Sequence, residues 1–203
     1  MYLAESPDHV RDSKQREGAQ LALPAAWTAF ITHTAGKWVP VASATMADLY
    51  ELTLALDLRD DLTEQELAEL RWHLGAGPQP ETLGIVTEFP VVVEEEDGEI
   101  VIEDHPEPLL ACHDAGYKVE GALVSVLLRK QGGGHDTWAL TSRQEIHPDD
   151  FDRTSQLLNW LASKADERHH GLDGSVDLGW IRFYEARLPE PLLARDGAVV
   201  WPS

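Results

Sequence analysis

Strict alternation of apolar and polar residues marks the first regular element of the chain. In DLYELTLALDL, residues 48–58, every second position from Tyr50 onward is apolar, and Glu51, Thr53 and Asp57 stand between these positions. Successive side chains of a strand point to opposite faces, so this pattern predicts a strand with one buried face.

The segment that follows this strand has the signals of a helix. In TEQELAELRWHLG, Thr63 and Glu66 have the spacing of a capping box, and Gly75 ends the helical pattern. The same order returns later, because HDTWALTSRQEIH at 135–147 alternates and PDDFDRTSQLLNWLASKA at 148–165 has apolar residues at helical spacing. The chain therefore contains two predicted strand–helix units.

A repeated hexapeptide indicates an internal duplication. PEPLLA occurs at 106–111 and again at 189–194, each time after a strand-like segment that contains Leu-Gly, beginning at Leu83 and at Leu178. We interpret this order as a pair of pseudo-duplicated strand–helix–strand halves. The extra length of the first half is VVVEEEDGEIVIED, in which Asp97-Gly98 between two strand-like arms predicts an inserted hairpin.

Two such halves predict an α+β protein over residues 46–203. The expected fold is a ferredoxin-like sandwich, one antiparallel sheet with two helices on one face. A further strand in YKVEGALVSVLLRK is expected to pair across QGGGH with the strand that contains Trp138. In ferredoxin-like proteins the bare sheet face is often covered by a second copy, so a homodimer is expected by analogy.

Charge and cysteine content narrow the classes of function. Acidic side chains outnumber basic ones by 36 to 16, and the resulting net charge of -20 disfavours direct nucleic-acid binding. The single cysteine, Cys112, cannot form an intrachain disulfide. No apolar run approaches the roughly 18 residues of a membrane span, and MYLAESPDHVRD lacks the regions of a signal peptide. We expect a cytoplasmic protein.

The stretch HVRDSKQREGAQLALPAAWTAF, from residue 9 to residue 30, combines a polar turn with a short apolar helix. The order and spacing of its residues resemble the small acidic actinomycete family that includes the developmental regulator BldB. This resemblance implies a role in protein binding, with a helix-turn-helix regulator as a partner and without catalytic residues. The residues expected to contact a partner are Arg11, Asp12, Lys14, Trp27 and Phe30.

Two interpretations of this N-terminal region stay open. Residues 1–45 form either a partial BldB-like segment that contributes to function or a fused remnant in front of a domain that begins at Met46. In either case the apolar helix needs a surface on which to pack.

Motifs for catalysis or metal binding are weak throughout the sequence. The nine histidines have no His-Glu-x-x-His or comparable ligand spacing, and no Gly-x-Ser-x-Gly elbow occurs. Cys112 lies beside His113 without an identifiable orienting partner. We therefore predict no catalytic residue, no metal site and no cofactor.

Aromatic residues on the predicted core elements form the most specific candidate site. A small apolar ligand held between helix and sheet would contact such side chains, with a histidine or tyrosine as the polar group. The candidate pocket residues are Trp72, His73, Tyr117, Trp160, Trp180 and Tyr184. The alternative is that these residues are ordinary core.

Three hypotheses for function follow. The first is a non-enzymatic regulatory or protein-binding protein of the cytosol. The second is a small metal-independent enzyme or ligand-binding protein of the dimeric α+β barrel kind, acting on an apolar or aromatic metabolite. The third is an acidic immunity-type inhibitor of a basic toxin, which predicts carboxylates gathered around Glu94 to Asp97. A cavity lined by Trp and His would favour the second, and an exposed apolar surface the first.

Overall fold

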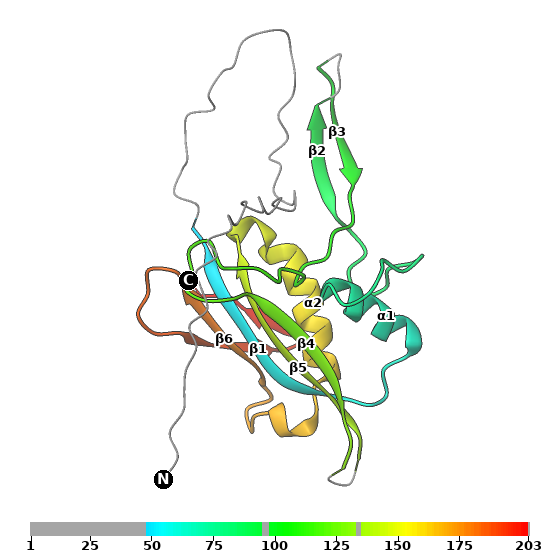
Figure 1. Ribbon diagram of the computed structural model, residues 1–203, viewed down its shortest axis with the longest axis vertical. Coiled ribbons are helices and arrows are strands. Elements are labelled where there is room, and N and C mark those ends of the chain that lie inside the picture. Colours follow the sequence, from blue (N-terminus) through cyan, green and yellow to red (C-terminus); the bar gives the residue numbers. More distant parts are fainter. Residues whose placement is uncertain (1–47, 95–97, 133–134, 203) are drawn as a thin grey trace, which may run out of the picture. The chain divides into compact units, whose positions relative to one another are not determined.

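The computed structural model describes residues 48–94, 98–132 and 135–202 of the 203-residue chain. Within these residues, eight strands, two α-helices and two short 3-10 helices follow one another along the chain (Figure 1). The strands are β1 (Tyr50–Arg59), β2 (Pro90–Glu94), β3 (Ile100–Asp104), β4 (Val124–Lys130), β5 (Thr137–Ile146), β6 (Val176–Phe183), β7 (Glu190–Arg195) and β8 (Ala198–Val200). The helices are α1 (Glu64–His73) and α2 (Phe151–Lys164), with 3-10 turns at Pro148–Asp150 and Glu167–His169.

Six of these strands form one antiparallel sheet in the order β4-β5-β1-β6-β7-β8. The central strand β1 pairs along its whole length with β5, from Tyr50 opposite Ile146 to Arg59 opposite Thr137. The strands β2 and β3 pair with each other in a separate two-stranded hairpin. The α+β class and the inserted hairpin are therefore confirmed.

The hydrophobic core lies between the sheet and the helices. The four leucines that alternate along β1, from Leu52 to Leu58, are at most 3% exposed, as their spacing predicts. Leu70 of α1 and Leu158 and Leu161 of α2 are fully buried against the same cluster. Burial of this apolar layer is the main favourable contribution to folding.

Both helices begin with the local signals that the sequence predicts. The Thr63 side chain accepts a hydrogen bond from the Glu66 backbone N–H, and the Glu66 carboxylate accepts one from the Thr63 N–H, which completes the capping box. Before α2, Pro148 and Asp149 lie in the 3-10 turn, where the His147 side chain accepts from the Asp149 N–H. These contacts satisfy backbone donors that have no partner inside a helix.

The predicted duplication does not extend to the strands that follow the helices. Among the described residues of the segment that begins at Leu83, only Pro90–Glu94 form a strand, and this strand belongs to the hairpin and not to the main sheet. The first PEPLLA copy, at 106–111, is irregular, whereas the second forms most of β7. The two identical hexapeptides therefore occupy different environments, and the sheet strand that follows α1 is β4.

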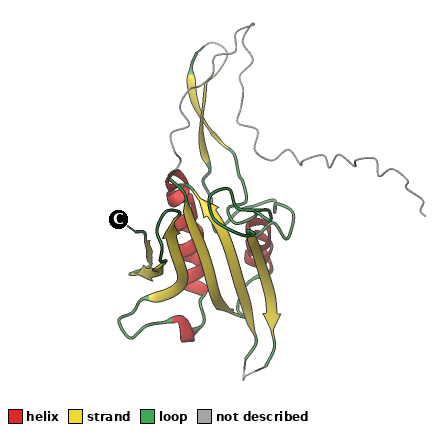
Figure 2. Cartoon of the chain, turned by 60° about the vertical axis from the view of Figure 1, so that its left-hand side comes forward, coloured by secondary structure: helices red, strands yellow, loops and turns green. Residues whose placement is uncertain are grey.

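The long helix α2 packs on one face of the six-stranded sheet, and α1 contributes Leu70 to the same core. Among the described residues, no helix covers the opposite face (Figure 2). No helix among the described residues is long and apolar enough to cross a membrane.

Candidate functional site

The side of the sheet that no described helix covers is called the open face below, and it carries the side chains that point away from the core. The strand registers assign its members, because the residues between the buried leucines of β1 share a face with their cross-strand partners. They are Val124, Val126, Leu128 and Lys130 of β4, Thr137, Ala139, Thr141, Arg143 and Glu145 of β5, Glu51, Thr53, Ala55, Asp57 and Arg59 of β1, and Trp180 and Arg182 of β6.

Large apolar side chains lie at both sides of this face. Val126 and Leu128 on the edge strand β4 are 41% and 61% exposed, and Trp180 on β6 is 45% exposed. The positions between them are small, since Ala55 of β1 is opposite Thr141 of β5. The open face therefore exposes large apolar side chains on β4 and on β6, and such exposure marks a candidate interaction surface.

Near one end of the open face, one carboxylate is shared by two arginines. Glu51 accepts from Arg143 Nε through Oε1 at 2.6 Å and from Arg182 Nε through Oε2 at 2.7 Å. Partial burial acts to raise the pKa of Glu51, but the hydrogen bonds from Arg182 and Arg143 outweigh it and hold that pKa below its ordinary value. Glu51 is thus ionised at neutral pH, and the triad has one positive charge in excess.

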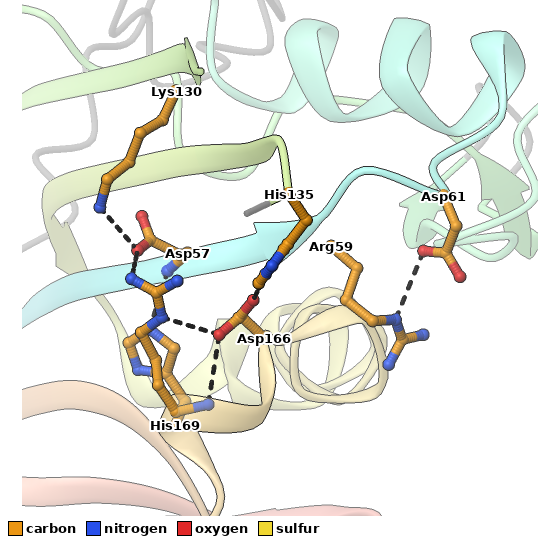
Figure 3. A network of polar contacts seen from close by, with 8 residues as sticks. Asp57, Arg59, Asp61, Lys130, His135, Asp166 and His169 are labelled. Carbon is orange, nitrogen blue, oxygen red and sulfur yellow. Dashed lines mark hydrogen bonds and ion pairs between the residues drawn. The ribbon is translucent and has the colours of Figure 1, made fainter. Parts of the chain in front are cut away.

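A second group of ionic contacts lies toward the other end of β1 (Figure 3). The Asp57 carboxylate binds Lys130 Nζ at 3.1 Å and Arg168 at 3.0 Å, and the Asp57 backbone N–H donates to Nε2 of His169 at 2.9 Å. Asp57 therefore connects the edge strand β4 to the turn that follows α2.

Asp166 belongs to the same network and is nearly buried, at 5% exposure. It accepts hydrogen bonds from His135 Nε2 at 2.9 Å and from Arg168 Nε at 2.7 Å (Figure 3). The bond from His135, followed by that from Arg168, holds the pKa of Asp166 far below its usual range. These contacts attach the loop after β4 to the end of α2.

A shallow hollow of about 150 Å³ lies beside the Glu51 triad. Its lining consists of Glu51, Thr53, Trp180, Arg182 and Pro189. Drug-sized ligands occupy pockets of about 300–1000 Å³. This hollow is therefore better suited to one side chain of a partner than to a whole metabolite.

The backbone beneath this hollow depends on one glycine. Gly179 of β6 has φ +134, and a Cβ atom at this position would lie 2.1 Å from the carbonyl oxygen of Thr53 on β1. The register of β6 against β7 shifts between Asp177 and Gly179, which identifies a β-bulge. This bulge allows β6 to approach β1 closely where Trp180 reaches the open face.

The loop at 114–122 is fastened near the same end of the sheet. The Glu145 carboxylate accepts the backbone N–H groups of Tyr117 at 2.8 Å and of Val119 at 2.6 Å. Lys118 in this loop places its Nζ 5.4 Å from the ring centroid of Tyr117 and 5.3 Å from that of Tyr184. These distances allow cation–π contacts with both rings.

The six predicted pocket residues do not line one shared cavity in the described part of the chain. Trp72 and His73 are buried at the end of α1, with ring centroids 4.6 Å apart, and Trp160 on α2 donates from Nε1 to Glu66 at 3.3 Å. Trp180 lies on the open face, on the other side of the sheet. The remaining two, Tyr117 and Tyr184, are joined through Lys118.

His73 is a core histidine and has an unusual environment. Its Nδ1 accepts a long hydrogen bond of 3.4 Å from the Leu109 N–H, whereas its buried Nε2 has no hydrogen-bond partner within the described structure. Nε2 lies 3.8 Å from Glu69, but that carboxylate already accepts the N–H groups of Gly84, Ile85 and Val86. Burial lowers the pKa of His73 to about 4, so the ring is neutral at pH 7.

No group of three or more His, Cys, Asp or Glu side chains in the described ranges is arranged to hold a metal ion. Cys112 is partly buried, and its backbone exchanges hydrogen bonds with the Gln144 side chain at 3.2 and 3.1 Å. This contact fixes the loop after the hairpin against β5.

The predicted protein-binding residues Arg11, Asp12, Lys14, Trp27 and Phe30 lie outside the described residues.

Sequence reasoning did not identify the open-face arginines. Arg143 and Arg182 are separated by about forty residues of chain and meet only because β1 lies between β5 and β6. The one signal in the sequence is Glu51, an acidic residue at a position of β1 that alternation assigns to the face away from the core.

Comparison of this chain with protein-family models, with curated proteins and with solved structures finds no match. The resemblance of residues 9–31 to the BldB family stays a prediction. The open face is the candidate site that rests on the structure alone.

Proposed function

We propose that this chain is a non-enzymatic, regulatory protein-binding protein, and that the open face of the sheet is its contact surface. The observation that carries the proposal is the exposure of Leu128, Val126 and Trp180 on one side of a sheet whose other side is fully packed. Large apolar side chains exposed on one face of a protein are characteristic of interaction sites.

The same proposal assigns the fold to the ferredoxin-like type. The strand order β4-β5-β1-β6 supports it, because in the chain α1 lies between β1 and β4, and α2 lies between β5 and β6. β7 and β8 then extend the sheet beyond the β6 edge. In such a sandwich the helices cover one face, and the other face is free to bind.

The chemistry of the open face restricts the partner. A partner segment needs apolar side chains to cover Leu128 and Trp180, and a carboxylate to approach the excess positive charge of Arg143 and Arg182 around Glu51. The hollow beside Trp180 would accept one side chain of that segment. An acidic, apolar protein segment satisfies both requirements.

The ligand-binding alternative has less support, because the hollow is smaller than ordinary metabolite sites and its lining contains Trp180 alone of the six predicted pocket residues.

The experiment compares the proteins that cross-link to the wild-type full chain with those that cross-link to two single-residue surface variants. Leu128→Asp places a charge on the open face, and Leu172→Asp is the matched control, because Leu172 is a fully exposed leucine in the turn before β6. We expect cross-linked partners of the wild-type chain to be lost from Leu128→Asp and kept by Leu172→Asp. Equal capture by the two variants would refute the proposal.

A further inference from the structure

The β2–β3 hairpin, called the arm below, exposes apolar residues that no strand of the described structure covers. The register places Val92 opposite Ile102 and Glu94 opposite Ile100, so these four side chains share one face of the arm. The apolar members Val92, Ile100 and Ile102 are 69% to 73% exposed. An isolated two-stranded hairpin is only marginally stable in water, so the arm gains stability by packing on another surface.

The composition of the arm determines which surface is suitable. Residues 90–104 contain seven acidic side chains and none that is basic, together with six Val and Ile residues. On a chain with a net charge of -20, an acidic arm is repelled by most of the molecular surface. It requires an apolar surface at which the negative charge is compensated.

The open face has both properties. Of its three strand carboxylates, Glu51 and Asp57 are each bound by two cations, and Glu145 accepts the backbone N–H groups of the 117–119 loop. Leu128 and Trp180 supply exposed apolar area. The arm and the open face therefore complement each other in charge and in polarity, although both belong to the same chain.

The arm of a given chain is held away from that chain's own open face. Both views show the hairpin projecting beyond the sheet and the helices (Figures 1 and 2). Its base is fixed, because the His105 N–H donates to the Phe89 carbonyl at 2.9 Å and the Phe89 N–H donates to Asp104 at 2.6 Å. An arm that projects in this way can reach the open face of a second copy.

We propose that the arm of one copy packs on the open face of a second copy, and that the reciprocal contact forms a two-fold symmetric dimer. The inference rests on the proposed function and names the partner segment: the acidic, apolar residues 90–104 of an identical chain. Exchange of the same element in both directions gives an isologous interface, the commonest type in homo-oligomers.

The first test removes the arm from the full chain. Residues 90–104 are replaced with Asn-Gly, which keeps Phe89 and His105 three positions apart, as the existing hydrogen bond between them requires in a tight turn. Light scattering during size-exclusion chromatography should give twice the 22.5 kDa chain mass for wild type and a single chain mass for this variant, at about 100 µM. A wild-type chain that is monomeric there, or a variant that stays dimeric, overturns the inference.

The second test mixes two defective chains. The arm-deleted chain keeps its open face, and the Leu128→Asp chain keeps its arm, so together they should form a one-sided heterodimer while each alone is monomeric. Leu172→Asp, which changes an exposed leucine elsewhere, should leave the wild-type dimer intact. If the mixture gives no heterodimer, the arm does not bind the open face.

These measurements separate the failure of this inference from the failure of the proposed function. A dimer that needs Leu128 but not the arm indicates two open faces packed together, so the open face remains a protein-binding surface while the arm proposal is wrong. A monomeric wild-type chain also rejects the arm proposal, whereas the capture experiment with Leu128→Asp and Leu172→Asp still decides the function.

Discussion

The buried His73 ring should make the stability of this protein fall as the pH is lowered. In the folded chain the pKa of His73 is lowered to about 4 by burial, compared with 6.5 for an unperturbed histidine. Between these two values the unfolded state binds a proton that the folded state does not bind. The free energy of unfolding therefore rises with pH across this window, and the contribution is lost as the pH falls below about 6.5.

The magnitude follows from the two pKa values. Each pKa unit corresponds to about 1.4 kcal/mol, so lowering the pH from about 7 to about 5 should cost about 2 kcal/mol through His73 alone. Glu69 does not reverse this sign, because its oxygens already accept three backbone N–H groups and lie 3.8 Å from Nε2 at the nearest.

The assay is urea unfolding of wild type and of His73→Gln at several pH values in this range. The substitution removes the titrating ring, so the difference in pH slope isolates its contribution even if the variant is less stable at every pH. We expect the wild type to lose about 2 kcal/mol more than the variant between about pH 7 and about pH 5. Equal slopes would show that His73 is accessible to protons in the folded state.

Other residues give separate predictions. Gly179→Ala should lower the free energy of unfolding by at least about 2 kcal/mol in urea, because the new Cβ would meet the Thr53 carbonyl oxygen. Gly197→Ala, which has open space around its Cβ, should lower it by about 1 kcal/mol. Similar losses for the two variants would contradict the bulge at Gly179. Glu69→Ala should cost about 3–5 kcal/mol in the same assay, since three loop N–H groups lose their acceptor, and a loss below about 1 kcal/mol would disprove that role. Because the folded-state pKa of Asp166 is depressed, this residue stabilises the fold at a pH above its pKa in the unfolded chain, and the stabilisation is lost as the pH falls below that value. Asp166→Asn should therefore weaken the dependence of the free energy of unfolding on pH in acid. An unchanged dependence would exclude the contacts with His135 and Arg168.

Local signals in the sequence predicted the local structure well. The alternation in β1 and the capping box at Thr63 depend on contacts between residues that are close in the chain. Asp196 and Gly197 have φ values of 50 and 80, as a two-residue turn between β7 and β8 requires. Such features are fixed by backbone geometry and need no knowledge of the distant parts of the fold.

Features that depend on strand pairing between residues far apart in the chain cannot be predicted from the sequence alone. The two PEPLLA copies have the same residues, but one lies in a loop from which Leu110 enters the core, and the other is paired to β6. Identical sequence does not determine structure when the cross-strand partners differ. For the same reason the sequence predicts one pocket for the six aromatic residues, although Trp180 lies on the open face and Trp72 in the core on the other side of the sheet.

The most direct test of the account measures whether the open face is covered when the full chain is concentrated. Hydroxyl-radical footprinting read by mass spectrometry, at about 1 µM and about 100 µM, reports the solvent exposure of individual side chains. We predict that oxidation of Leu128, Trp180 and Ile102 falls at the higher concentration while that of Leu172 stays constant. Unchanged oxidation of Leu128 and Trp180 at both concentrations would contradict the claim that this face binds a second copy.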